Sequence, residues 1–196
     1  MKSHFQKCIL LLMFSISTLL LHGQTEKGRL YVGANLRNFS IGISRNSSQF
    51  GIGLDPAMGK FVADNWVVGG RLGLSFGMQR DAGRNFNSTG FAISAGAFSR
   101  YYFSLSKRIK PFVELETGIG QGFANANGMR FDPRWAYFQA SGGAAFFISK
   151  NASLDLSLGF RGTTELDKSA LGNLAGGLQA KVGFSLYLPN GNRKRE

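Results

Sequence analysis

The stretch 59–79 (GKFVADNWVVGGRLGLSFGMQ) carries the pattern that most restricts how this chain can fold. After a run at 59–65 that we interpret as a turn, apolar side chains alternate with small or polar ones. Because successive side chains of a β-strand leave opposite faces, the alternation predicts a strand with two unlike faces. One face carries Val68, Leu72, Leu74, Phe76 and Met78, and the other carries Gly, Ser, Gln and the single charge of Arg71. A face of small residues suits the crowded interior of a narrow barrel, and the apolar face then suits contact with lipid.

The same alternation recurs along the chain and predicts an all-β fold, an eight-stranded antiparallel up-and-down transmembrane β-barrel. The expected strands are 28–43, 49–58, 66–79, 90–103, 110–123, 135–148, 153–164 and 176–188. We expect a bulge near 37–38, where the alternation changes parity, and another near Pro56, because proline cannot donate to a ladder. An even strand number with longer loops alternating with short turns is typical of bacterial barrels.

The N-terminus has the pattern of a secretory signal peptide. Lys2 and Lys7 precede an apolar run at 8–21, which is too short for a transmembrane helix, and a small-residue cleavage site follows near Gly23. We therefore divide the chain into a signal peptide (1–23), an outer-membrane barrel domain (24–188) and a basic periplasmic tail (189–196).

The expected mature chain lacks cysteine and histidine, because Cys8, His4 and His22 all lie before the cleavage site. Most Ser and Cys nucleophiles use a His base, and most zinc sites use Cys or His. We therefore expect no enzymatic activity, no metal and no cofactor.

Composition and charge restrict the partners. Charged residues make up 17%, and the chain has 27 Gly and 18 Phe, which fits a membrane barrel better than a soluble domain. The net charge of +12 comes from basic residues dispersed over many segments, so no nucleic-acid module is expected. Arginines in expected loops could contact lipopolysaccharide phosphates as bidentate donors, or could simply be solvated. These arginines are Arg45, Arg80, Arg84, Arg130 and Arg134.

The inward faces are predicted to gather charges into one polar cluster. If the turn at 104–109 is symmetric, Arg100 falls opposite Glu114 as a cross-strand ion pair. Glu114 and Glu116 share a face and could form an acid pair for glycoside or metal chemistry. We favour a salt-bridge plug instead, because an eight-stranded barrel is narrow enough for side chains to fill. The predicted cluster consists of Asp55, Arg71, Arg100, Glu114, Glu116, Asp155, Arg161 and Lys181.

Aromatic residues gather near the expected strand ends, where interfacial girdles of membrane barrels lie. The residues assigned to these girdles are Trp66, Phe76, Phe91, Tyr101, Phe103, Phe112, Phe123, Trp135, Phe147 and Tyr187.

Three short motifs occur in a characteristic order: GKFVADN at 59–65, RYYF at 100–103 and PFVE at 111–114. Through them, and through its signal sequence, the chain resembles the OmpA/OmpX-like outer-membrane β-barrel domain family, in the form common in the Bacteroidetes. The resemblance implies a structural or surface role through extracellular loops in the outer membrane of a Gram-negative bacterium. The last strand also looks like the terminal signal read by the barrel-assembly machinery, carried here by Lys181, Gly183, Leu186 and Leu188.

We expect a monomer in contact with the lipid bilayer and lipopolysaccharide. Two alternatives remain open at this point. A soluble secreted lipocalin-like barrel would bind a small apolar ligand, with its Leu and Phe faces inward and Arg71, Glu114 and Arg161 outward. An outer-membrane lipid-modifying enzyme would need a carboxylate base, for which Glu114, Glu116 and Asp155 are the candidates.

Overall fold

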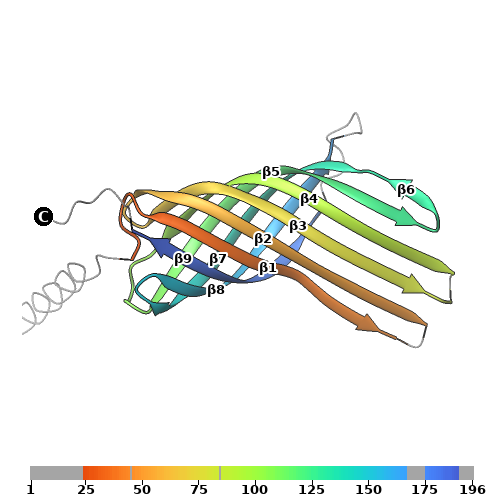
Figure 1. The fold of residues 1–196 in the computed structure, drawn as a ribbon, viewed down its shortest axis with the longest axis horizontal. Coiled ribbons are helices and arrows are strands. Elements are labelled where there is room, and N and C mark those ends of the chain that lie inside the picture. Colours follow the sequence, from red (N-terminus) through yellow and green to blue (C-terminus); the bar gives the residue numbers. More distant parts are fainter. Residues whose placement is uncertain (1–23, 45, 84, 167–174, 190–196) are drawn as a thin grey trace, which may run out of the picture.

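The computed structural model describes residues 24–44, 46–83, 85–166 and 175–189. The strands are β1 (Leu30–Ile43), β2 (Ser47–Ala63), β3 (Trp66–Asp81), β4 (Phe86–Tyr102), β5 (Ile109–Ala126), β6 (Met129–Phe131), β7 (Arg134–Ser149), β8 (Ala152–Glu165) and β9 (Ala175–Leu188). The eight long strands pair antiparallel in the order β4-β3-β2-β1-β9-β8-β7-β5, and β4 also pairs with β5, so the sheet closes into a barrel (Figure 1). The predicted fold class is confirmed.

The two ends of the barrel differ (Figure 1). At the turn end, β1 begins and β9 ends, and the connections at 64–65 and 150–151 are tight. Asn65 has a φ of 65°, a left-handed conformation that Asn tolerates better than most residues. At the opposite loop end, long hairpins project beyond the body of the barrel. The predicted signal peptide lies outside the described residues, as does the predicted tail except Pro189.

Side-chain orientation follows the predicted alternation. On β5, for example, Val113, Leu115 and Ile119 are exposed, whereas Glu114 and Glu116 are buried inside the barrel. This orientation is the reverse of the one that the lipocalin-like alternative requires, so that alternative is wrong. No helix in the part of the chain that the structure describes is long and apolar enough to cross a membrane.

Two local predictions about β2 are wrong. The run at 59–65 is not mainly a turn, because β2 continues to Ala63 and only two residues separate it from β3. No bulge forms at Pro56: it pairs with Ala34 of β1, and the β2–β3 register is the same at Leu54–Leu74 and at Ala57–Arg71. Pro56 fits into β2 without a bulge because the pairing of β2 with β3 is interrupted beside it, while the backbone of β2 stays extended.

The predicted bulge in β1 is confirmed. The β1–β2 register shifts between Arg37 and Ser40, and Asn38 has a φ of 53°. A bulge at Asn38 increases the local twist of β1 and changes the direction in which the neighbouring side chains point, as bulges usually do. The bulge explains why the outward residues change parity after Leu36.

The core of the barrel is an aromatic cluster near the turn end, and it corrects part of the predicted girdle. Tyr187, Phe147 and Phe112 are buried inside, where Phe147 and Tyr187 have ring centroids 5.0 Å apart. Their parity is that of the inward residues, so strand-end position alone was a misleading criterion. Trp135 also turns inward, against Gly120. The exposed members of the predicted girdle are Trp66, Phe76, Phe91, Tyr101, Phe103 and Phe123.

Candidate functional site

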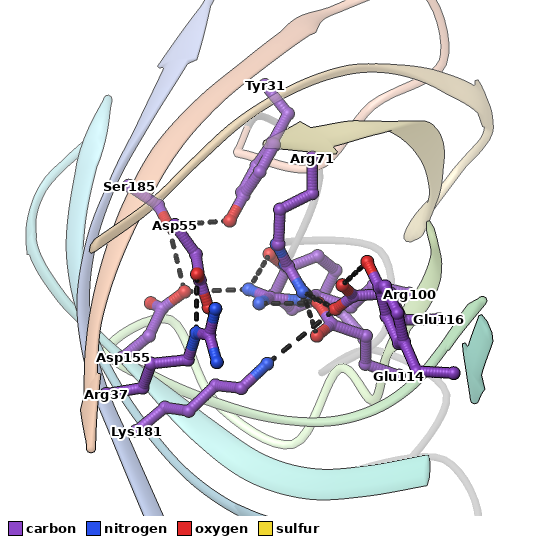
Figure 2. Close-up of polar contacts among 12 residues, drawn as sticks. Tyr31, Arg37, Asp55, Arg71, Arg100, Glu114, Glu116, Asp155, Lys181 and Ser185 are labelled. Atoms are coloured by element: carbon purple, nitrogen blue, oxygen red, sulfur yellow. Dashed lines mark hydrogen bonds and ion pairs between the residues drawn. The ribbon is translucent and has the colours of Figure 1, made fainter. Parts of the chain in front are cut away.

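All eight predicted inward charges lie buried inside the barrel, together with Arg37 of β1. We call these nine residues the lumen cluster; Figure 2 shows most of them pointing toward one another from strands around the barrel. The lumen cluster consists of Arg37, Asp55, Arg71, Arg100, Glu114, Glu116, Asp155, Arg161 and Lys181.

Glu114 is the centre of the lumen cluster. Its two carboxylate oxygens accept hydrogen bonds from both terminal nitrogens of Arg71, at 2.8 and 3.0 Å. Arg100 lies opposite Glu114 in the β4–β5 register and donates from Nε at 2.8 Å, with Nη2 at 2.7 Å. The predicted cross-strand pair is therefore confirmed. Arg71 adds a second partner, and its bidentate, charge-assisted hydrogen bonds are stronger than neutral ones.

The other carboxylates near Glu114 are also fully engaged. Glu116 accepts from Arg71 and from the Tyr137 hydroxyl at 2.8 Å, and Lys181 Nζ lies 3.6 Å away. Asp155 accepts from Arg100 at 2.7 Å, and also from the hydroxyls of Ser153 at 2.6 Å and Ser185 at 2.9 Å. The polar network therefore extends from β3 across the interior to β8 and β9 (Figure 2).

Aromatic faces complete the surroundings of the guanidinium groups. Arg100 lies over Phe112 at 4.1 Å from the ring centroid, and Arg71 lies over Phe98 at 4.8 Å. Cation–π contacts of this kind become stronger when water is excluded. They join the charged layer to the aromatic cluster at the turn end.

Arg37 and Asp55 form a separate ion pair nearer the loop end, with Nε 2.6 Å from the carboxylate. Gly73 lies beside this pair: a Cβ there would come within 2.9 Å of Arg37 Nη2 and 3.2 Å of the Asp55 carboxylate. The missing side chain of Gly73 leaves room for the pair and for the Ser94 hydroxyl, which a Cβ there would overlap.

The predicted acid pair does not point at open space. Glu114 and Glu116 both face guanidinium nitrogens at ion-pair distance. Within the described ranges, no group of three or more Asp, Glu, His or Cys is placed to hold a metal ion. These ion pairs neutralise the charged side chains and fix their positions in the interior of the barrel.

Two cavities open above the lumen cluster, on the loop-end side. One of about 410 Å³ is lined by Arg37, Arg161, Ser94 and residues 175–179, and another of about 440 Å³ is lined mainly by β2, β3, β4 and β5. Asn38, Ser75, Ala92 and Trp135 line both cavities, so we treat them as one loop-end chamber.

The sequence reasoning missed two buried cations, Arg37 and Lys110. Arg37 has the inward parity of Tyr31, Gly33 and Asn35, but the expected bulge obscured this signal. Lys110 Nζ donates to Thr25 Oγ1 at 2.8 Å at the turn end. Strand parity within 110–123 places it inward with Glu114, so the sequence did contain the signal.

The arginines assigned to loops have a different placement from the one predicted. Arg80 is the second-last residue of β3, Arg130 lies in β6 and Arg134 begins β7, and all three are exposed. The strands continue into the predicted loops because polar hairpins can pair without an alternating pattern when both faces meet water. Arg45 and Arg84 lie outside the described residues.

The proposed assembly-signal residues all lie in β9. Lys181 and Gly183 face inward, and a Cβ on Gly183 would overlap the Asn35 side chain. Leu186 and Leu188 belong to the outward face. Their role in assembly stays a prediction.

Comparisons with known proteins concern the fold. No family model matches the sequence, and no curated protein matches it. Among solved structures, the N-terminal β-barrel domain of Pseudomonas aeruginosa OprF is similar with a TM-score of 0.51 and 16% identity, covering 83% of this chain and 98% of that chain. Neisserial surface protein A is similar with a TM-score of 0.50 and 12% identity, covering 81% of this chain and 96% of that chain. The chain thus has the eight-stranded antiparallel fold of outer-membrane β-barrels.

Proposed function

We propose that this protein is an integral outer-membrane barrel that acts through its loop end, and that the lumen cluster closes its interior. The observation that carries the proposal is the inversion of polarity. Apolar side chains cover the outside, where Leu115 is 65% exposed and Leu158 59%, while six basic and four acidic side chains of the described residues are buried inside. Lipid is the solvent in which such a surface is stable, and the pairing of each long strand with two neighbours satisfies most of the backbone polar groups there.

Closure of the interior is supported by what fills it. The ion pairs around Glu114 and the rings of Tyr31, Tyr102 and Tyr187 occupy successive layers, and all of these side chains are buried. An eight-stranded barrel leaves little room beyond such side chains. We therefore favour a structural or surface role over solute transport or catalysis.

The outer surface of the loop end suits contact with lipopolysaccharide. Arg80 continues the outward parity of Phe76 and Met78, and Arg134 that of Ala136 and Phe138. Guanidinium groups in this position meet phosphates at the level of the lipid headgroups. We extend the proposal to a monomer inserted by the barrel-assembly machinery in a Gram-negative outer membrane, and to a Bacteroidetes-type member of the family that the sequence resembles.

The proposal is tested by gel mobility of the protein from washed outer membranes, with and without boiling in SDS. A folded membrane barrel resists unheated SDS, so we expect a faster band without heating and a slower band after boiling. Recovery in the soluble fraction, with the same mobility in both samples, would contradict membrane insertion.

Closure of the interior makes a separate prediction. Liposomes containing the purified, heat-modifiable protein should swell no faster in small sugars than protein-free liposomes, because the buried ion pairs leave no continuous aqueous path. A general porin at the same protein-to-lipid ratio serves as the positive control. Swelling at a rate that approaches that of the porin would contradict the proposed plug while leaving the barrel itself intact.

A further inference from the structure

The barrel wall is incomplete between its first and last strands. β1 pairs with β9 only from Leu30 to Arg37, whereas β3 pairs with β4 along all of Trp66–Asp81. Beyond Arg37, within the described residues, β1 pairs only with β2, and residues 175–180 of β9 pair only with β8. Figure 1 shows β1 and β9 diverging toward the loop end. We call the interval between residues 38–43 and 175–180 the seam.

The seam begins at membrane depth. The β1–β9 pairing covers about 23 Å of strand, which at a tilt of about 40° corresponds to about 18 Å of height. The apolar band of such barrels is about 25 Å tall. With Leu30 and Leu188, where the pairing begins, placed at the inner boundary of that band, the seam opens below its outer boundary, at the level of the outer leaflet. Phe39, Ile41 and Leu178 beside it are exposed.

The loop-end chamber lies directly behind the seam. The 410 Å³ part of the chamber is lined on one side by Arg37 and Asn38 of β1 and on the other by residues 175–179 of β9. Its lining therefore includes both borders of the seam. A ligand in this chamber could extend sideways into lipid as well as outward into water.

The chamber carries positive charge that the described residues do not compensate. Arg161 lies over Tyr137 at 3.7 Å, is buried, and has no carboxylate at ion-pair distance among the described residues. Arg37, which also lines the chamber, uses Nε for its pair with Asp55. Ser94, Ser75 and Thr163 add hydroxyl donors to the lining. The Arg161 guanidinium therefore lines the chamber without a carboxylate partner among the described residues, and a bound anion would provide the charged acceptor that it lacks.

We propose that the loop-end chamber binds the phosphate or carboxylate headgroup of an amphiphile, which enters from the outer leaflet through the seam. Arg161 and Arg37 hold the headgroup, and the hydrocarbon chain remains in the seam beside Phe39 and Leu178. The inference rests on the proposed membrane placement, and it adds a ligand class and an entry route that the surface role does not include.

Trp135 lies in the chamber and provides the readout. In a Trp66→Phe background it is the tryptophan that remains in the chain. The folded protein in nonionic maltoside micelles is titrated with dodecyl phosphate, expressed as mole fraction in the micelle. We expect saturable change in Trp135 fluorescence, and no saturable change with a dodecyl trimethylammonium salt. Every sample is first shown to be heat-modifiable, so failure of binding is distinguished from failure of membrane-barrel folding.

Inorganic phosphate distinguishes the two possible sources of the headgroup. We expect it to compete with dodecyl phosphate only at far higher concentration, because it lacks the chain. If inorganic phosphate alone saturates the change in Trp135 fluorescence at the same concentration as the amphiphile, entry through the seam is overturned.

Arg161→Gln is expected to weaken dodecyl phosphate binding by about ten-fold or more, since it removes a charged donor. Lys107→Gln, which removes an exposed basic side chain at the turn end of the barrel, is the matched control and should bind like the parent. Equal binding by the two variants would overturn the site. If Arg161→Gln does not fold, Arg161→Lys and Ser75→Phe take its place: the first loses the planar fork and the second fills the chamber. Unchanged binding in both would likewise refute the proposal.

Discussion

Glu114 accepts hydrogen bonds from two arginines that come from different strands, and this sharing makes the interior interdependent. Arg71 and Arg100 lie on β3 and β4, and each would lose a partner if the carboxylate became neutral. Removing one partner of a buried pair leaves uncompensated charge, whereas exposed pairs contribute little. The same substitution should therefore have very different effects inside and outside the barrel.

We expect Glu114→Gln to lower the free energy of unfolding by roughly 3–5 kcal/mol. Asp132→Asn is the matched control: Asp132 is exposed, its contact with Arg130 is 3.4 Å long, and its loss should cost less than about 1 kcal/mol. The measurement is urea unfolding of the barrel in phospholipid vesicles, followed by loss of the faster unheated gel band. Equal midpoints for the two variants would show that the pair at Glu114 contributes no more than a surface contact.

At the scale of the strands, β2 and β3 approach so closely at Gly59 and Gly69 that neither has room for a side chain. The two glycines are paired, and a Cβ on Gly69 would overlap the backbone carbonyl of Met58. Phe98 packs against this point, since a Cβ on Gly59 would lie 3.2 Å from its ring. The glycines thus create the space in which Phe98 supports Arg71.

Gly69→Ala should destabilise the barrel by about 1–3 kcal/mol through overpacking, because the obstructing atom belongs to the backbone and cannot rotate away. The adjacent Gly70→Ala should be tolerated, since its Cβ would lie 3.9 Å from the nearest atom, the Gly96 carbonyl oxygen. Both variants are compared by the fraction that folds into vesicles and by urea midpoint. Similar loss in both would mean that chain flexibility, rather than close approach, determines the requirement for glycine.

How much of this structure the sequence predicts depends on whether a contact joins adjacent strands of one hairpin or more distant strands. Alternation correctly oriented Arg100 and Glu114, because a hairpin with a short turn fixes which residues face each other. It could not reveal the contact of Arg71 with Glu114, because that contact spans β4 and depends on strand stagger, which a period of two does not encode. Nor could it find β6 or the outer ends of β3 and β4, because strands that meet water on both faces lose the alternation.

The two ends of the whole barrel differ: exposed arginines lie on the outer wall at the loop end, and short turns lie at the turn end. Arg80 and Arg134 lie near the loop end, whereas Lys107 is exposed in the connection between β4 and β5. In the proposed orientation only the first two face lipopolysaccharide. The same change in net charge should therefore matter at one end and not at the other.

The double variant Arg80→Gln with Arg134→Gln should weaken binding of fluorescent lipopolysaccharide to the detergent-solubilised protein by roughly two- to ten-fold. The effect should diminish at high salt, because exposed charges are screened. Lys107→Gln serves as the control and should leave binding unchanged. An equal loss in the control would indicate general attraction to a basic protein.

The short pairing between β1 and β9 also affects the order of folding. Every other pairing between long strands joins neighbours in the chain, but closure brings Arg29 to Asn151 and to the backbone of Tyr187, at 2.5 Å each, across 122 and 158 residues. Bringing such distant segments together costs loop entropy that local hairpins avoid. The β1–β9 pairing that closes the barrel should therefore form last. It is also the shortest pairing between long strands, so unfolding should begin with its separation.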